Sequence, residues 1–225
     1  MTHPNLEFSK ESVGHLQYGF PMVYEDRQEA VSSQFIDDFE TTVNNINTKN
    51  QKLIVATHTT MKGVNQSGLS NLLDALTQIK DTVSIVSVGN QYSENLRNKY
   101  ISNGIYIYRS IPQMMALQKA DLCINHGGIH TINECIHYKT PMVILSGNKH
   151  DQNGCAVRVS HFGCGISSCA NENSVSEIVS YIKEVMSNST YRSKIEALNE
   201  SYKKAKEENV FEKYVEHFIS SRAQT

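Results

Sequence analysis

Residues 125–131 combine two adjacent glycines with polar side chains that could bind an anion. They read Asn-His-Gly-Gly-Ile-His-Thr, and they join an apolar run at residues 122–124 to a predicted helix over residues 130–138. Adjacent glycines let a ligand approach the backbone closely, and the first N–H groups of a helix attract negative charge together with the helix dipole. A phosphate group is therefore the ligand that this turn favours.

Side chains of the same segment add polar groups around such a phosphate. His126 can donate a hydrogen bond, or carry a full charge when an anion raises its pKa, and the Thr131 hydroxyl is a further donor. Glu134 lies four residues after His130, where its carboxylate can accept hydrogen bonds from two vicinal hydroxyls of a ribose. An isolated Gly-Gly pair is more often a tight turn without a ligand, but these surroundings favour a binding site.

A second polar cluster follows the next predicted strand, which covers residues 142–145. It consists of His150, Asp151 and Gln152. Adjacent Asp and Gln side chains offer the carboxylate and amide groups that recognise sugar hydroxyls, although alone they are also typical of a polar turn. Because the carboxyl ends of parallel strands meet at one edge of a sheet, we expect this cluster to lie beside residues 125–131.

The chain alternates predicted strands with predicted helices. Short apolar runs typical of buried strands occur at residues 53–56, 83–88, 105–108, 122–124 and 142–145. One intervening helix is predicted with Ser67 as its N-cap and leucines along one face, and a short helix directly after Pro112. The alternation predicts an α/β fold: a single Rossmann-like domain in which helices cover both faces of a doubly wound parallel sheet.

The chain divides into two predicted segments of unequal length. Residues 1–50 are polar and irregular before a periodic stretch around Phe35, which predicts a linker-like segment with a helix. Residues 51–225 form the predicted domain together with its C-terminal helices, and a domain of that size is common.

Two patterns mark the C-terminal helices. A capping box at Ser174 and Glu177 predicts the start of one helix. The last apolar stripe is more typical of a packed core face than of a partner-binding or membrane-surface helix. Its members are Val210, Phe211, Tyr214, Val215, Phe218 and Ile219.

The composition is that of an ordinary globular protein. Hydrophobic residues make up 39% of the 225 residues and charged residues 20%, which excludes collagen-like, coiled-coil and largely disordered chains. A formal net charge of -2 gives no long-range attraction to phosphate backbones, so we expect no nucleic-acid partner. Apolar runs are far shorter than the roughly 18 residues of a membrane-spanning helix, and residues 1–10 lack the order of a signal peptide. We therefore expect a cytoplasmic protein without a membrane span.

The polar segments belong to a longer pattern that carries a family resemblance. Residues 120–134 read Ala-Asp-Leu-Cys-Ile-Asn-His-Gly-Gly-Ile-His-Thr-Ile-Asn-Glu, followed by Lys-Thr-Pro-Met-Val-Ile at 139–144 and Asp-Gln at 151–152. This order resembles the donor-site signature of UDP-glycosyltransferases with the glycosyltransferase B fold, which is His-x-Gly-x-x-Ser/Thr-x-x-Glu, Gly-x-Pro-Met and Asp/Glu-Gln. Upstream, Ser-Ile-Pro-Gln at residues 110–113 is similar to the family's Trp-x-Pro-Gln, which holds the uracil. Residues 57–60 stand where the family's first strand of this domain ends near the phosphates.

The resemblance implies how a nucleotide sugar would be bound along the central segment. His126 and Thr131, with the backbone around Gly128 and Ile129, would bind the diphosphate. Glu134 would bind the ribose hydroxyls. His126 would also stabilise the charge on the diphosphate as it departs, whereas the general base of the reaction is expected outside this chain.

The remaining parts of the donor fall to other matching positions. Asp151 and Gln152 would hold the transferred sugar, and Ile111 and Gln113 would contact the edge of the base. The implied donor-binding residues are Thr60, Ser110, Ile111, Gln113, His126, Gly127, Gly128, Ile129, His130, Thr131, Glu134, Asp151 and Gln152.

Several positions depart from the family pattern. Ser110 replaces the stacking Trp, Thr59 replaces the glycine of the first turn, and Cys155 stands where the family often has Asn. Without the aromatic platform, on the order of 1 kcal/mol of stacking is lost, so phosphate binding is better supported than a preference for uridine. Tyr106 or Tyr108 either replaces that platform or is a core residue of its strand.

The resemblance implies a UDP-sugar-dependent glycosyltransferase that transfers a hexose to an acceptor hydroxyl. It covers only the C-terminal, donor-binding half of such enzymes, so activity is expected when an acceptor-binding domain completes the site. The UDP-sugar is a substrate, no further cofactor is implied, and no metal is expected because the Asp-x-Asp motif of metal-dependent transferases is missing from the sequence.

Three other interpretations stay open at this point. The chain could be a non-catalytic nucleotide-sugar-binding subunit, similar in plan to split UDP-GlcNAc transferases in which a partner chain carries the acceptor half. It could be a fragment of a longer transferase. A nucleotide-sugar epimerase on the same fold is less favoured, because it would need acidic groups from both halves.

Overall fold

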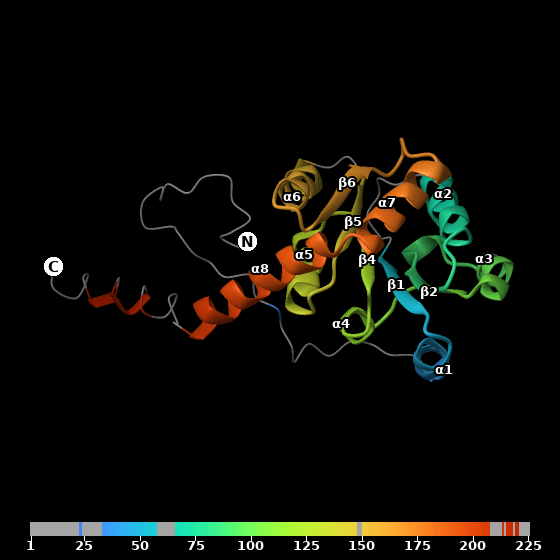
Figure 1. The fold of residues 1–225 in the computed structure, drawn as a ribbon, viewed down its shortest axis with the longest axis horizontal. Coiled ribbons are helices and arrows are strands. Elements are labelled where there is room, and N and C mark those ends of the chain that lie inside the picture. Colours follow the sequence, from blue (N-terminus) through green and yellow to red (C-terminus); the bar gives the residue numbers. More distant parts are fainter. Residues whose placement is uncertain are drawn as a thin grey trace.

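The computed structural model of this chain is built on one six-stranded sheet, in which every strand is parallel to its neighbours (Figure 1). It describes residues 23, 33–57, 66–147, 150–207, 213, 215–217, 219 and 220. The strand order is β3-β2-β1-β4-β5-β6. The strands are β1 (Lys52–Thr57), β2 (Thr82–Ser87), β3 (Ile105–Tyr108), β4 (Leu122–Asn125), β5 (Met142–Ser146) and β6 (Gly165–Cys169). The predicted doubly wound parallel sheet is confirmed.

Helices cover both faces of the sheet, because the side chains of its strands alternate between two apolar clusters. Ile54 and Ala56 face a cluster with helices α2, α3 and α7, whereas Leu53 and Val55 face a cluster with helices α1, α4, α5, α6 and α8. The helices are α1 (Ser33–Lys49), α2 (Gln66–Leu76), α3 (Glu94–Tyr100), α4 (Gln113–Leu117), α5 (Ile129–His137), α6 (His150–His161), α7 (Val175–Ser187) and α8 (Ser189–Glu207). Strands buried on both faces explain the continuous apolar runs of the sequence.

Most predicted elements are confirmed with small shifts of their ends. The five predicted strands correspond to β1–β5, and the helices predicted around Phe35, after Pro112 and over residues 130–138 correspond to α1, α4 and α5. The capping box is present: the Ser174 hydroxyl accepts from the Glu177 N–H, and the Glu177 carboxylate accepts from the Ser174 N–H. The boundary between linker and domain at residue 50 stays a prediction.

Other expectations are wrong or incomplete. Ser67 is not an N-cap, because α2 already begins at Gln66. Elements β6, α3 and α6 were not predicted, since β6 is half-buried at the edge of the sheet and lacks a continuous apolar run. In the C-terminal stripe, Ile219 is 62% exposed, so it does not pack in the core, and Val215 is half-buried. The other members, Val210, Phe211, Tyr214 and Phe218, lie outside the described residues.

The register of the central strands brings the chemistry-bearing segments to one edge. Thr57 at the end of β1 pairs with Asn125 at the end of β4, and Asn125 pairs with Ile144 in β5. The strand order reverses between β1 and β4, where open parallel sheets bind ligands at the carboxyl ends of their strands. The segments that follow β1, β4 and β5 therefore begin side by side.

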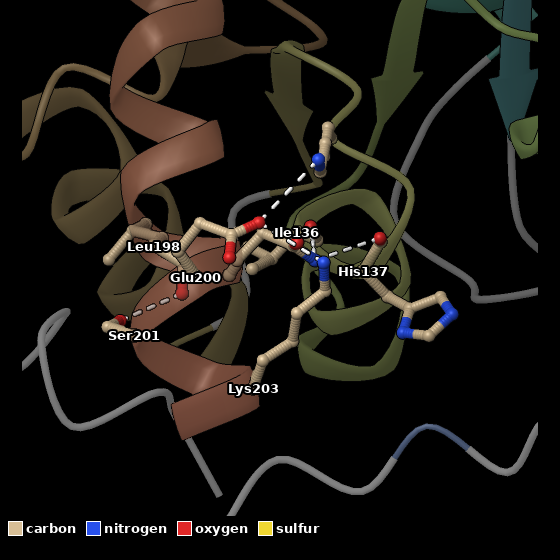
Figure 2. Close-up of polar contacts among 8 residues, drawn as sticks. Ile136, His137, Leu198, Glu200, Ser201 and Lys203 are labelled. Atoms are coloured by element: carbon tan, nitrogen blue, oxygen red, sulfur yellow. Dashed lines mark hydrogen bonds and ion pairs between the residues drawn. The ribbon is translucent and has the colours of Figure 1, made fainter. Parts of the chain in front are cut away.

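Helix α5, which starts at this edge, is held at its other end by α8. The buried Asn199 amide of α8 donates hydrogen bonds to the Ile136 carbonyl at 3.0 Å and to the His137 carbonyl at 2.9 Å. Close by, the Glu200 carboxylate lies 3.1 Å from the Lys203 ammonium (Figure 2). Carbonyls in the last turn of a helix have no partner within the helix. The Ile136 carbonyl also accepts from the Lys139 N–H beyond the helix, and Asn199 adds side-chain donors to two carbonyls and thereby fixes the end of α5.

We predict that Asn199→Asp destabilises the protein strongly. The substitution replaces an amide donor by a carboxylate that faces two carbonyl oxygens at the negative end of the α5 dipole. We expect the free energy of unfolding, measured by urea denaturation, to fall by about 3 kcal/mol. Ser201→Ala is the control, because the Ser201 hydroxyl donates to the Leu198 carbonyl of its own helix. Equal stability of the two variants would contradict this role of Asn199.

Candidate functional site

The turn between β4 and α5 can be built only with glycine at its centre. Gly127 has φ +88°, and a Cβ added there would lie 2.9 Å from the Gln152 carbonyl oxygen and 3.2 Å from the Ile144 side chain. The Gly127 N–H donates to the Asn125 side-chain oxygen at 2.8 Å, which closes an Asx turn. Asn125 thus shapes the turn, and the sequence analysis did not assign it that role.

The imidazole of His126 lies over the start of α5. A Cβ on Gly128, the N-cap residue, would lie 2.6 Å from His126 Nε2, so the ring is packed against the backbone there. Gly128 offers no side chain to cap the first turn. The N–H groups of that turn and the His126 ring therefore face the same space at the carboxyl edge of the sheet, which suits an anion.

The electrostatics of His126 favour a neutral ring before any ligand binds. Burial lowers the pKa of His126, and the backbone of Thr57 and the charge of Asp151 only partly oppose this effect. A neutral imidazole has one donor and one acceptor nitrogen. An anion placed beside the ring would favour its protonated form and raise the pKa.

Two buried polar atoms beside this turn lack hydrogen-bond partners. They are Nδ1 of His126 and the hydroxyl oxygen of Thr57, and neither has a partner of hydrogen-bonding geometry within the described part of the chain. The Thr57 backbone nonetheless lies near enough to the His126 ring to affect its pKa. Buried polar groups are rarely left unpaired in folded proteins. These two atoms therefore mark the place where a polar ligand group would be accommodated.

A polar cluster joins α4 to α5 and contains three of the predicted site residues. The Gln113 amide donates to the Thr131 hydroxyl at 3.1 Å and also to the Glu134 carboxylate. Thr131 and Glu134 are buried, at 7% and 4% exposure. In this cluster the Gln113 amide holds the Glu134 carboxylate. The carboxylate could accept hydrogen bonds from two hydroxyls of a diol in place of the bond from the amide.

The second predicted cluster forms the start of helix α6. The buried Gln152 accepts a hydrogen bond from the Gly147 N–H at 3.1 Å, and its backbone carbonyl lies against Gly127. Asp151 is exposed in the first turn of α6, near enough to act on the pKa of His126. Gln152 thus supports the chain after β5 and the glycine turn, while Asp151 presents its carboxylate to solvent.

The other predicted site residues differ in how far they are exposed to solvent. Ser110 and His130 are exposed, whereas Ile111 and Ile129 are half-buried, and Ile111 packs against the apolar cluster on the α5 side of the sheet. Thr60 lies outside the described residues.

Neither tyrosine of β3 provides a stacking platform. The Tyr108 ring is buried and its hydroxyl donates to Asp38, and Tyr106 packs against the same apolar cluster as Ile111. Tyr108 is therefore a core residue, and Tyr106 is half-buried against the same core.

The described residues contain neither a metal-binding cluster nor a membrane-spanning helix. Within them, no group of three or more His, Cys, Asp or Glu side chains is arranged to hold a metal ion. No helix among them combines the length and the apolar character that crossing a membrane requires. The cytoplasmic location stays a prediction.

Comparison with known proteins places the chain in a family. The model of the erythromycin biosynthesis protein CIII-like C-terminal domain matches residues 70–216. In Bacillus subtilis (strain 168), the "Uncharacterized UDP-glucosyltransferase YdhE" is 26% identical over 155 residues, which cover 69% of this chain and 38% of that protein. The "NDP-glycosyltransferase YjiC" of the same strain is 30% identical over 122 residues, covering 54% of this chain and 30% of that protein. The chain thus spans well under half the length of these relatives.

Solved structures share the fold at low sequence identity. Spinosyn rhamnosyltransferase SpnG superposes with a TM-score of 0.68 and 16% identity, over 89% of this chain and 51% of that chain. Glycosyltransferase VinC, solved in complex with dTDP, gives 0.66 and 12% identity over 89% of this chain and 46% of that chain. The glycosyltransferase B resemblance of the sequence is therefore confirmed for the fold. Because the family model covers more than half of the chain, this protein belongs to the erythromycin biosynthesis protein CIII-like C-terminal domains, a donor-binding domain family of glycosyltransferases.

Proposed function

We propose that this chain binds a UDP-sugar and forms the donor half of a hexosyltransferase. One observation carries the proposal: the open N-terminus of α5, the His126 ring and the polar cluster of Gln113, Thr131 and Glu134 meet at one edge of the sheet. The acceptor half would come from another segment or from a partner chain, since the chain covers only 38% and 30% of the curated relatives.

The diphosphate would occupy the space in front of the glycine turn. The first N–H groups of α5 and the helix dipole would stabilise its charge, and Gly127 and Gly128 would let it approach the backbone. The unpartnered Nδ1 of His126 and the Thr57 hydroxyl would gain partners at the same time. These groups supply the charge compensation, so we propose that donor binding needs neither a metal nor a cofactor.

The ribose and the base would lie toward α4. The Glu134 carboxylate would accept hydrogen bonds from the ribose hydroxyls, which would replace the bond that Gln113 donates in this structure. Because Ser110 offers no ring, the base would be selected by hydrogen bonds from the backbone near Ile111 and not by stacking. Asp151, exposed beside His126, and Gln152 would hold the sugar.

In the proposed reaction, negative charge would develop on the diphosphate, next to His126 and the N-terminus of α5. In glycosyl transfer, the bond between the sugar C1 and the diphosphate oxygen breaks, the acceptor oxygen bonds to C1, and the acceptor proton moves to a general base. His126 and the N-terminus of α5 would stabilise the negative charge that develops on the departing diphosphate. The general base would belong to the acceptor half.

We predict that His126→Ala weakens UDP-glucose binding by at least about tenfold, because a hydrogen bond to a charged phosphate is lost. Isothermal titration calorimetry on the purified chain measures the change. His161→Ala is the control, because His161 is exposed in the last turn of α6 and packs on Phe162. If wild type and His126→Ala bind with the same Kd, the proposed site is wrong.

We also predict that UDP-glucose binding takes up a proton at His126. Burial lowers the pKa of His126 in the free protein, so the ring is neutral near neutral pH, and the bound diphosphate raises that pKa. Affinity should therefore increase as the pH falls from about 8 to about 6, by at most about tenfold per pH unit.

Calorimetry in two buffers with different ionisation enthalpies measures this proton uptake directly. UDP-glucose is the appropriate probe, because its diphosphate diester does not itself titrate in this range. The uptake should disappear in His126→Gln. Equal uptake in wild type and variant would assign the proton to another group.

A further inference from the structure

The half-buried carboxylate of Asp38 ties helix α1 to the end of the edge strand β3. One oxygen of Asp38, Oδ2, accepts hydrogen bonds from the Arg97 guanidinium of α3 and from the Tyr108 hydroxyl of β3, each at 2.6 Å. Arg97 is 5% exposed. Asp38, Arg97 and Tyr108 are called the Asp38 clasp below.

Further contacts hold the three residues of the Asp38 clasp in place. Arg97 also donates to the Ile107 carbonyl at 3.1 Å, and its guanidinium lies 5.1 Å from the centre of the Tyr108 ring. On the α1 side, the Phe35 ring meets the Tyr108 ring edge-on at a centroid distance of 5.2 Å. The last two residues of β3 are therefore fixed from α1 and α3 at once.

The end of β3 has few contacts within the sheet to hold it. β3 has four residues and pairs only with β2, because it is one of the two outer strands of the sheet. The chain then continues directly into residues 109–113, which contain the proposed base-contacting residues Ile111 and Gln113 and place Gln113 against Thr131 and Glu134. Any shift at Tyr108 is passed to this segment.

The start of this segment is also fixed by β2, because the Arg109 carbonyl accepts from the Gly89 N–H at 2.9 Å and from the Ser87 hydroxyl at 3.3 Å. Its end is fixed by the hydrogen bonds that Gln113 donates to Thr131 and Glu134. Ser110, between these two points, is exposed and has no large side chain to anchor it. The course of the chain around Ser110 thus depends on where β3 ends.

We propose that Asp38 is a positioning residue that, through Arg97 and Tyr108, sets the loop of residues 109–113 and thereby the nucleobase selectivity of the donor site. This inference rests on the proposed function. A site without an aromatic platform selects a base by backbone hydrogen bonds, which tolerate errors of only about 0.5 Å. The ion pair of Arg97 and Asp38, whose side chains are 6% and 23% exposed, is expected to add little stability compared with an apolar replacement, whereas its hydrogen bonds require one geometry.

The same contacts couple α1 to the donor site. α1 reaches the donor loop through the Asp38 clasp, and Asp38 lies far from Tyr108 in sequence, 70 residues away. A shift of α1 would therefore change the position of the loop of residues 109–113 relative to a bound base.

The test compares nucleotide selectivity in the full chain. Calorimetry gives the Kd of UDP, dTDP, CDP and inorganic pyrophosphate for wild type and Asp38→Asn. We expect the Kd ratios among the three nucleotides to change by at least about fivefold, while the Kd of pyrophosphate, which reaches only the α5 side of the site, stays within about twofold. Asp37→Asn is the matched control, because Asp37 is the exposed neighbour of Asp38 on the same helix.

Tyr108→Phe provides an independent variant, since it keeps the ring and removes only the hydroxyl bond to Asp38. It should change the same ratios in the same direction by a smaller factor. Unchanged ratios in both clasp variants, or equal weakening of pyrophosphate and all nucleotides, would overturn the positioning role. If wild type binds none of the nucleotides, the proposed function itself fails, and this inference fails with it.

Discussion

The parallel pairing of β1 with β4 is the constraint on which the candidate site depends. It places the end of β1 at Thr57 level with the end of β4 at Asn125, and it forms the point where the strand order reverses. Both strands are buried on both faces, so their register is determined by apolar packing and not by the polar residues that follow them. The glycine turn and the unpartnered atoms of Thr57 and His126 meet only because of this register.

Helix α5 must itself be held in place for its N-terminus to lie at the proposed site. A helix of nine residues would be marginal alone in water, so tertiary contacts must hold it. Ile132 and Ile136 pack in the apolar cluster under the helix, and Asn199 of α8 satisfies its last carbonyls. With the body and the C-terminus fixed in this way, the N-terminus is held in front of the site without a capping side chain.

Partly buried polar contacts connect the site to distant parts of the chain. The Gln113 amide joins the segment after β3 to α5, and the Asp38 clasp joins the same segment to α1. Each contact links groups whose apolar surroundings would make an unpaired partner costly. Such contacts favour one arrangement of loops over others, and precise binding of a nucleotide requires this.

The sequence by itself determined the parallel sheet, the position of α5, and the His-Gly-Gly turn with Thr131 and Glu134, because these follow from apolar runs and from short motif spacing. It could not reveal β6 or α6, whose polar residues lack a clear period. Only the tertiary structure decided that Tyr108 is a core residue and that Asp38 meets Arg97, which is 59 residues away. The physical reason is the range of the interactions: backbone propensity and helical period act over a few residues, whereas an ion pair between two helices depends on how whole elements pack.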